Sequence, residues 1–140
     1  MPSATVHVRV PFVDVDSSLR IHFTAMFRYM EVAEHELMRS LGLPYATALR
    51  TLAFPRVHLD CDFHRAIAYD DELDVTAKIE RVGGSSWTVL FTALPSGAEP
   101  TAPALAVGHM TIVAMDQATE RATALPDDLR RALLGEGGES

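Results

Sequence analysis

The chain has 140 residues, of which 48% are hydrophobic and 22% charged, the composition of an ordinary globular protein. Its formal charge of −7 disfavours nucleic acid as a partner, because proteins that bind it carry basic surfaces that neutralise phosphates. Cys61 is the only cysteine and cannot form an internal disulfide, which fits a reducing compartment. The first residues do not resemble a secretion signal, and no apolar stretch is long enough to cross a membrane. We therefore expect one cytoplasmic domain over residues 1–134, followed by a disordered tail at 135–140.

The first predicted element is a β-strand. Val6, Val8 and Val10 alternate with polar side chains, which is typical of a half-buried strand. Pro11 has no backbone N–H to donate, so we expect the strand to lie at the edge of a sheet or to bend there.

A helix is predicted from about Thr24 to Leu41. Its apolar residues recur every three or four positions: Met26, Met30, Ala33, Leu37 and Leu41. Thr24 is a candidate N-cap, and Gly42 marks the C-terminal end. Val32 widens the apolar face, so we expect the helix to be covered on more than one side. A short second helix is predicted over residues 45–51.

The rest of the chain predicts an antiparallel sheet. Apolar and polar residues alternate over 57–63, 73–79 and 87–93, and Gly83-Gly84-Ser85 supplies residues that accept the positive φ of a hairpin turn. Residues 104–115 are apolar on both faces, which is typical of a strand buried on both sides. A short strand near 121–124 and a helical turn over 127–134 follow. Without alternating β and α segments, an α+β fold is favoured over a parallel sheet.

The segment from Pro11 to Tyr29 offers the clearest chemistry. Asp14 and Asp16 end a strand, and the helix starts one short loop later, near Phe23 or Thr24. The first N–H groups of a helix lack intrahelical partners and carry partial positive charge, so they can polarise a carbonyl oxygen. A nearby carboxylate can attack that carbonyl or activate a water against it. This arrangement is the minimum needed to cleave an acyl bond.

Three blocks in the same order resemble the 4-hydroxybenzoyl-CoA thioesterase family of hotdog-fold proteins. They are FVDVDSSLRIHFTAMFRYMEVAE from Phe12, CDFHRAIAYDDELDV from Cys61, and GHMTIVAMDQATERATALPDDLRRAL from Gly108. The resemblance covers nearly the whole chain. It implies a five- to six-stranded antiparallel sheet wrapped around one long central helix, and hydrolysis of an acyl-CoA or acyl-carrier-protein thioester.

The resemblance also assigns roles. Asp16 corresponds to the catalytic carboxylate, as nucleophile or as general base. The backbone N–H of Phe23, with that of Thr24 beside it, corresponds to the donor that polarises the thioester carbonyl. His22 is a candidate for contact with the acyl group or the water. The family often has Gly three or four positions after the acid, where this chain has Leu19 and Arg20. These roles require the Asp16 carboxylate to face the space into which the helix directs its free amides.

The expected substrate contacts come from two segments. Met26 and Phe27 on the helix could accept an aromatic ring or a fatty chain. The stretch that contains Pro55, Arg56 and His58 is implied to line the pocket of a neighbouring subunit, because similar proteins join two sheets edge to edge and many pair again into tetramers. Coenzyme A is part of the substrate, and no other cofactor is expected. An acidic chain needs local arginines to bind it, and the candidates are Arg20, Arg28, Arg56 and Arg65.

A metal centre is disfavoured. Glu31, Glu34 and His35 lie on the helix, but Glu31 and His35 are four residues apart and no paired helix completes the ligand set. A solvated or interface role suits the two glutamates better, although another hotdog branch uses a helix glutamate as its carboxylate. Cys61 is expected to be a buried structural thiol.

Two other functions stay open. Hotdog hydratases and dehydratases use an Asp and a downstream His, but Asp16 and His22 are one residue further apart than that motif usually has, and its Asn-Pro is missing. A protein that binds acyl groups without catalysis is the second alternative.

Overall fold

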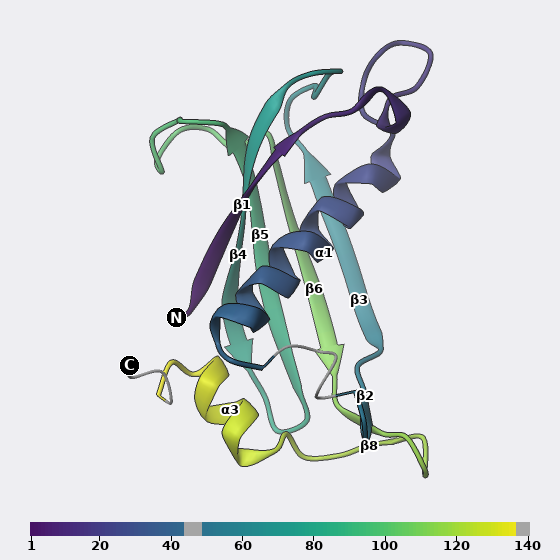
Figure 1. Ribbon diagram of the computed structural model, residues 1–140, viewed down its shortest axis with the longest axis vertical. Helices are drawn as coiled ribbons and strands as arrows, with labels where there is room; N and C mark the ends of the chain where they lie inside the picture. The colour runs from purple at the N-terminus through teal and green to yellow at the C-terminus, as the bar shows by residue number, and fades with distance from the viewer. Residues whose placement is uncertain (44–48, 137–140) are drawn as a thin grey trace.

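One antiparallel sheet and one long helix form the framework. The computed structural model describes residues 1–43 and 49–136. The strand order is β1-β4-β5-β6-β3, with β1 (Ser3–Arg9), β3 (Arg56–Phe63), β4 (Glu72–Val82), β5 (Ser86–Pro95) and β6 (Ala106–Val113). Helix α1 (Phe23–Ser40) lies across one face of the sheet, with the hydrophobic core between them (Figure 1). The predicted α+β architecture is confirmed, and β1 is an edge strand as Pro11 suggested.

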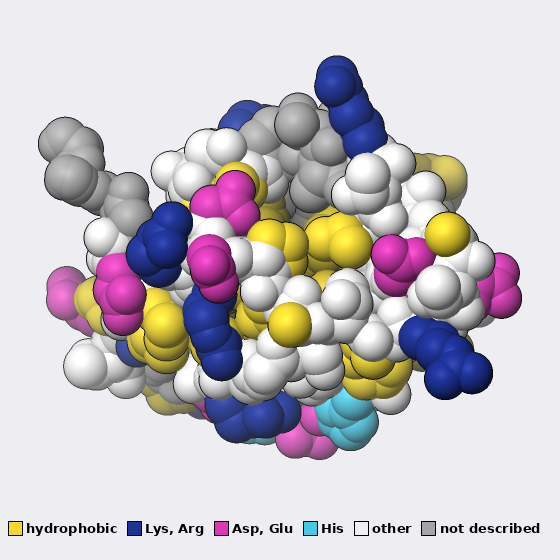
Figure 2. Space-filling view, turned by 90° about the horizontal axis from the view of Figure 1, so that it is seen from below, with side chains coloured by type: hydrophobic (Ala, Val, Ile, Leu, Met, Phe, Trp, Pro, Cys, Tyr) yellow, Lys and Arg dark blue, Asp and Glu magenta, His cyan; other side chains and the backbone are white. Residues whose placement is uncertain are grey.

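Smaller elements close the ends. The 3-10 turn η1 (Phe12–Asp14) precedes α1. The short strands β2 (Leu52–Ala53), β7 (Met115–Asp116) and β8 (Arg121–Ala122) form a small second sheet at the same end of the molecule as α3 (Asp127–Leu133), on the other side of that end (Figure 1). Figure 2 looks onto that lower end, where basic and acidic side chains are interspersed. No helix within residues 1–43 and 49–136 has both the length and the apolar character needed to cross a membrane.

Helix α1 buries the predicted apolar stripe. Met26, Met30, Ala33 and Leu37 are almost completely inaccessible to solvent, and Gly42 adopts a φ of 76° just after the helix. Two details differ from the prediction. The N-cap is His22 rather than Thr24, and Val32 is 54% exposed because it faces away from the sheet.

Strand β3 is an edge strand whose apolar side is open. It was predicted to bury alternate residues, yet Val57, Leu59 and Phe63 are all exposed. The prediction of burial is wrong within one chain because α1 packs mainly against β1 and β4, leaving the inner face of β3 uncovered. Strand β3 pairs with β6 without interruption from His58↔Thr111 to Phe63↔Ala106. The prediction of a strand over these residues is therefore confirmed.

Strand β6 buries alternate residues only, which differs from the predicted burial on both faces. The outer face of the sheet has no covering layer in the described chain, so every second side chain is half exposed.

The β4–β5 hairpin forms where predicted, with Gly83 N–H donating to Ser86 O at 2.7 Å. Neither Gly83 nor Gly84 has the positive φ that was expected of this turn from the sequence. Of the predicted helix at 45–51, residues 45–48 lie outside the described residues and 49–51 form a turn. Of the predicted tail, 137–140 also lie outside them.

Candidate active site

The loop over residues 15–21 is a tight hairpin that leads into α1. Val15 bridges Ile21, Arg20 bridges Ala68, and Asp16 N–H donates to Arg20 O at 2.9 Å. Leu19 at the tip has a φ of 63°, in the left-handed region that glycine accepts most easily. Leu19 therefore adopts a backbone conformation that is costly for a residue with a side chain. These bonds hold the chain on both sides of Asp16.

Asp14 is a buried carboxylate, 4% exposed, that anchors this loop to the helix. Its Oδ2 accepts a hydrogen bond from the Tyr29 hydroxyl at 2.6 Å, and its Oδ1 accepts one from Arg28. Burial raises the pKa of Asp14, but the bonds from Tyr29 and Arg28 outweigh it and leave the pKa below its usual value. Burial and the bond to Asp14 raise the pKa of Tyr29. Asp14 is therefore an ionised structural group.

Asp16 is exposed and forms a local turn. Its Oδ1 accepts hydrogen bonds from Ser18 Oγ at 2.6 Å and from Ser18 N–H at 2.8 Å. These bonds lower the pKa of Asp16, with smaller contributions from the Arg20 backbone N–H and from nearby His22. Both Ser18 bonds are accepted by Oδ1. The carboxylate is therefore ionised at neutral pH.

The start of α1 presents one open amide. His22 Nδ1 accepts a hydrogen bond from Thr24 N–H at 3.3 Å and lies 2.7 Å from Thr24 Oγ1. The Thr24 amide is thus used by the helix cap, contrary to its expected role as a second donor to the thioester. Phe23 N–H has no hydrogen-bond acceptor in the described part of the chain, and the Phe23 ring stacks on His22 with 4.7 Å between centroids. His22 therefore has a structural role at the helix start.

A cavity of about 350 Å³ opens beside Phe23, and we call it the Phe23 cavity. Its wall combines the loop and helix start with the end of β3 and the segment that follows: Arg20, Ile21, Phe23, and residues 63–67. Asp16 is adjacent in sequence but does not line this wall in a single chain, because its carboxylate turns toward Ser18. The roles assigned from the sequence required the Asp16 carboxylate to face the space in front of the Phe23 amide. In a single chain it does not, because the carboxylate is not part of the wall of the Phe23 cavity.

The other residues predicted to contact substrate lie in three different environments. Met26 is 1% exposed and belongs to the core, so in a single chain its side chain is not accessible to a substrate. Phe27 and Arg56 line a second hollow of about 220 Å³ between α1 and β3. Pro55 is exposed and accepts a hydrogen bond from Val113 N–H at 3.1 Å.

His58 lies on the outer face of the sheet, away from α1 and the Phe23 cavity. Its Nε2 is 2.7 Å from Asp60 Oδ2, and Asp60 Oδ1 is 3.0 Å from His109 Nδ1. Residues alternate along β3, so His58 and Asp60 share this outer face while Leu59 faces inward beside Met110. The predicted substrate contact by His58 is therefore not supported in a single chain.

One buried ion pair was missed by sequence reasoning. Glu34 is 0% exposed, and its Oε2 accepts a hydrogen bond from Arg56 Nη1 at 2.6 Å. Glu34 is four residues after Met30 and three before Leu37, so its place on the apolar stripe was the available signal.

Burial raises the pKa of the half-buried Cys61 thiol to about 11, which argues against a nucleophilic role. Within the described residues, no group of His, Cys, Asp and Glu is arranged to hold a metal ion.

Comparison with known proteins adds independent information. The Thioesterase superfamily model matches residues 20–94. A "Putative esterase" of Aquifex aeolicus is 32% identical over 85 residues, which are 59% of this chain and 66% of that protein. A 1,4-dihydroxy-2-naphthoyl-CoA hydrolase of Prochlorococcus marinus is 28% identical over 137 residues, 91% of this chain and 87% of its own. The structure of a 1,4-dihydroxy-2-naphthoyl-CoA thioesterase from Synechocystis superimposes with a TM-score of 0.83 at 19% identity, covering 94% of this chain and 96% of that one.

Proposed function

The chain belongs to the thioesterase superfamily, and from that premise we propose that it hydrolyses an aromatic acyl-CoA thioester at the junction of loop 15–21 and α1. The observation that carries the proposal is the Phe23 amide, which has no acceptor among the described residues and opens beside a cavity of about 350 Å³. Aromatic side chains of Phe23 and Phe63 in that wall suit an aromatic acyl group. The names of the Prochlorococcus and Synechocystis relatives support the same class of substrate.

In the proposed reaction, the Phe23 N–H donates a hydrogen bond to the thioester oxygen as negative charge develops on it. One such donor is typically worth about a hundred- to a thousandfold in rate. Asp16 then acts in one of two ways. Its Oδ2, which Ser18 does not contact, attacks the carbonyl carbon and expels the coenzyme A thiolate, and water hydrolyses the resulting anhydride to regenerate the carboxylate. Alternatively, Asp16 accepts a proton from the water that attacks the carbonyl directly.

The proposal includes assembly of two chains through β3, and a further pairing into a tetramer. The open edge of β3 and its exposed inner residues Val57, Leu59 and Phe63 support this, since such an edge readily pairs with another strand. A partner chain there would cover the uncovered side of the Phe23 cavity and bring Asp16 into a closed site. A cytoplasmic location is part of the proposal, in keeping with the single cysteine. Light scattering that shows a stable, active monomer would contradict the assembly.

The direct test is Asp16→Asn, which keeps the shape of the side chain and removes both proposed roles. We expect turnover of benzoyl-CoA to fall by at least about a hundredfold with an unchanged melting temperature, because the Asp16 side chain is exposed. Ser17→Ala, a neighbouring exposed position, is the control. Retained turnover in the Asp16 variant would remove Asp16 from the mechanism.

A substrate panel separates the remaining alternatives. Aromatic, short-chain and long-chain acyl-CoA esters, together with an acyl carrier protein ester, identify the acyl group and its carrier. Hydration of crotonyl-CoA in preference to hydrolysis would favour a hydratase. Binding of acyl-CoA without turnover would favour a non-catalytic protein.

A further inference from the structure

The four arginines considered for substrate binding have two different environments. Arg28 donates to the buried Asp14 carboxylate, and Arg56 donates to the buried Glu34 carboxylate. Both charges are therefore neutralised inside the chain. Arg20 and Arg65 make no side-chain hydrogen bond or ion pair with any residue in 1–43 or 49–136.

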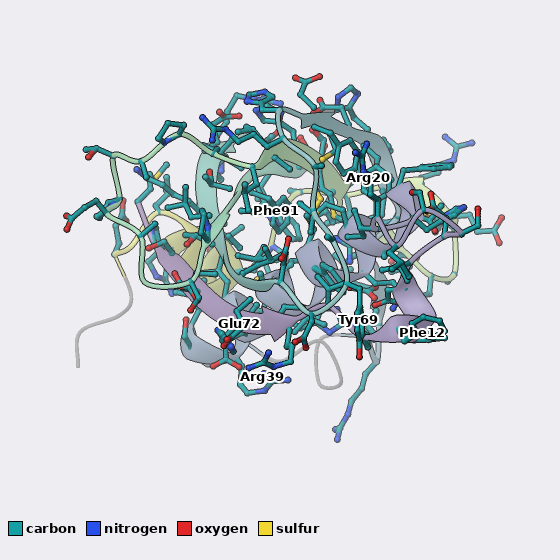
Figure 3. The ribbon with its side chains drawn as sticks, turned by 90° about the horizontal axis from the view of Figure 1, so that it is seen from above. Phe12, Arg20, Arg39, Tyr69, Glu72 and Phe91 are labelled. Carbon is teal, nitrogen blue, oxygen red and sulfur yellow. The ribbon has the colours of Figure 1, made fainter. Side chains whose placement is uncertain are left out.

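Both unpaired arginines line the Phe23 cavity. Arg20 belongs to the loop before α1 and Arg65 to the segment after β3, and the two segments are joined by the Arg20–Ala68 bridge. Figure 3 looks onto this end of the molecule and shows Arg20 well separated from Arg39 and Glu72. His64 is the third basic side chain of this wall. No Asp or Glu is among the residues that line it.

This local excess of positive charge contrasts with the chain as a whole, which has a formal charge of −7. Arg9, in contrast, pairs with Asp70 and Glu72, and Arg39 pairs with Glu36. A guanidinium presents several N–H donors in a planar arrangement that matches carboxylate and phosphate oxygens. Two unpaired ones at one cavity, without a neighbouring carboxylate in its wall, form a recognition site for an anionic group.

We propose that Arg20 and Arg65 together bind an anionic oxygen group of the thioester substrate and thereby set its specificity. This inference rests on the proposed function, because it places the anion on the molecule whose carbonyl meets Phe23. The anion has two possible sources: a phosphate of coenzyme A, or an acidic substituent on the acyl group. A cavity of about 350 Å³ holds an acyl group but not a whole nucleotide, so a phosphate would bind at its mouth and an acyl substituent inside it.

The test uses the variants Arg20→Gln and Arg65→Gln, singly and together. Arg121→Gln is the matched control, because Arg121 is also exposed and without an ion pair in the described chain but lies in the small sheet at the opposite end. Three probes separate the sources: benzoyl-CoA, S-benzoyl-N-acetylcysteamine, which has no phosphate, and S-(4-carboxybenzoyl)-N-acetylcysteamine, which is anionic only in its acyl group.

We expect the double variant to raise KM for an anionic probe by about ten- to a hundredfold, the usual value of hydrogen bonds to charged groups, with kcat changed less than about threefold. Loss confined to benzoyl-CoA assigns the site to phosphate, and loss confined to the carboxybenzoyl probe assigns it to the acyl substituent. The wild-type KM should rise with salt, and that rise should be smaller in the variant. An effect no larger than that of Arg121→Gln, or an equal loss with the neutral probe, would overturn the proposal.

An equilibrium measurement keeps this test independent of turnover. Calorimetry with coenzyme A and with terephthalate, the free acid of the third probe, reports anion binding even if no thioester is hydrolysed. Weaker binding of either one to the double variant, but not to the Arg121 control, supports the arginine pair whatever the fate of the hydrolase proposal. Equal binding of both by variant and wild type contradicts it.

Discussion

The Tyr29 hydroxyl donates a hydrogen bond to Asp14 Oδ2 at 2.6 Å, and this bond joins the second turn of α1 to the 3-10 turn η1. Both groups are buried, and Arg28 holds the other carboxylate oxygen. The 15–21 loop is thus fixed at its start by Asp14 and at its end by the helix cap at His22. Asp16 lies between these two fixed points, and the Phe23 amide directly follows the second of them.

Tyr29→Phe should lower the free energy of unfolding by about 1–3 kcal/mol, the usual worth of a hydrogen bond to a charged group. Because the pKa of folded Asp14 is lowered, its stabilising interaction is present above the unfolded Asp value of about 3.9 and is lost as the pH falls through the folded value. The difference between wild type and variant should therefore shrink in acid. Denaturant titrations at several pH values measure it, with Tyr69→Phe, an exposed tyrosine, as the control. A difference that does not depend on pH would contradict an ionised Asp14.

Phe23→Pro should remove the proposed carbonyl donor without breaking the helix. Phe23 is the first helical residue, where proline is tolerated, and His22 has the extended conformation that precedes proline readily. We expect kcat to fall by about a hundred- to a thousandfold relative to Phe23→Ala, which loses the ring but keeps the N–H. Circular dichroism should be the same for both variants. Equal kcat values would show that this amide does not polarise the substrate.

Ser18→Ala should shift the acid limb of the pH–rate profile. Hydrogen bonds from Ser18 lower the pKa of Asp16, so removing the hydroxyl raises it. If the reaction needs ionised Asp16, activity is lost as the pH falls through that pKa, and the variant should lose activity at a higher pH than the wild type. Profiles of kcat/KM from about pH 4 to 8 measure the shift. Ser17→Ala should leave the limb in place, and an unshifted limb in Ser18→Ala would separate the rate from Asp16 ionisation.

Leu19→Gly should be more stable than Leu19→Ala by about 0.5–1 kcal/mol. Both changes remove the same side-chain contacts, and only glycine accepts the φ of 63° without steric cost. The comparison therefore isolates backbone conformation. Thermal unfolding of the two variants measures it, and greater stability of the alanine variant would mean that the loop does not hold this conformation in solution.

Gly108→Ala should destabilise the protein by about 1–3 kcal/mol, the usual cost of adding a methyl group to a packed core. A Cβ at Gly108 would lie 2.6 Å from Asp60 O and 2.8 Å from Met30 Cε, and the backbone oxygen cannot move aside without disturbing the β3–β6 pairing. Gly84→Ala is the control, since its Cβ would meet no atom within 4 Å. Chemical denaturation should show a loss for Gly108→Ala only; equal stability of both would contradict the close approach of α1 to β6.

Local patterns in the sequence determined the elements. The stripe from Met26 to Leu37 and the alternation along β4 and β5 predict secondary structure because each depends only on the period of a helix or a strand. The order of these elements, together with three short motifs, pointed to the hotdog fold and to thioester hydrolysis. The position of Asp16 in a loop before the helix could be predicted for the same reason, since a loop and a helix start are local features.

Only the tertiary structure decided which groups are paired. Arg28 and Arg20 look equivalent in the sequence, but one donates to buried Asp14 and the other lines an open cavity. The exposure of β3 depends on where α1 crosses the sheet, and the occupied Thr24 amide depends on how His22 turns at the cap. Charge pairing and burial are sums over neighbours that are distant in the chain, so no pattern of a few adjacent residues contains them.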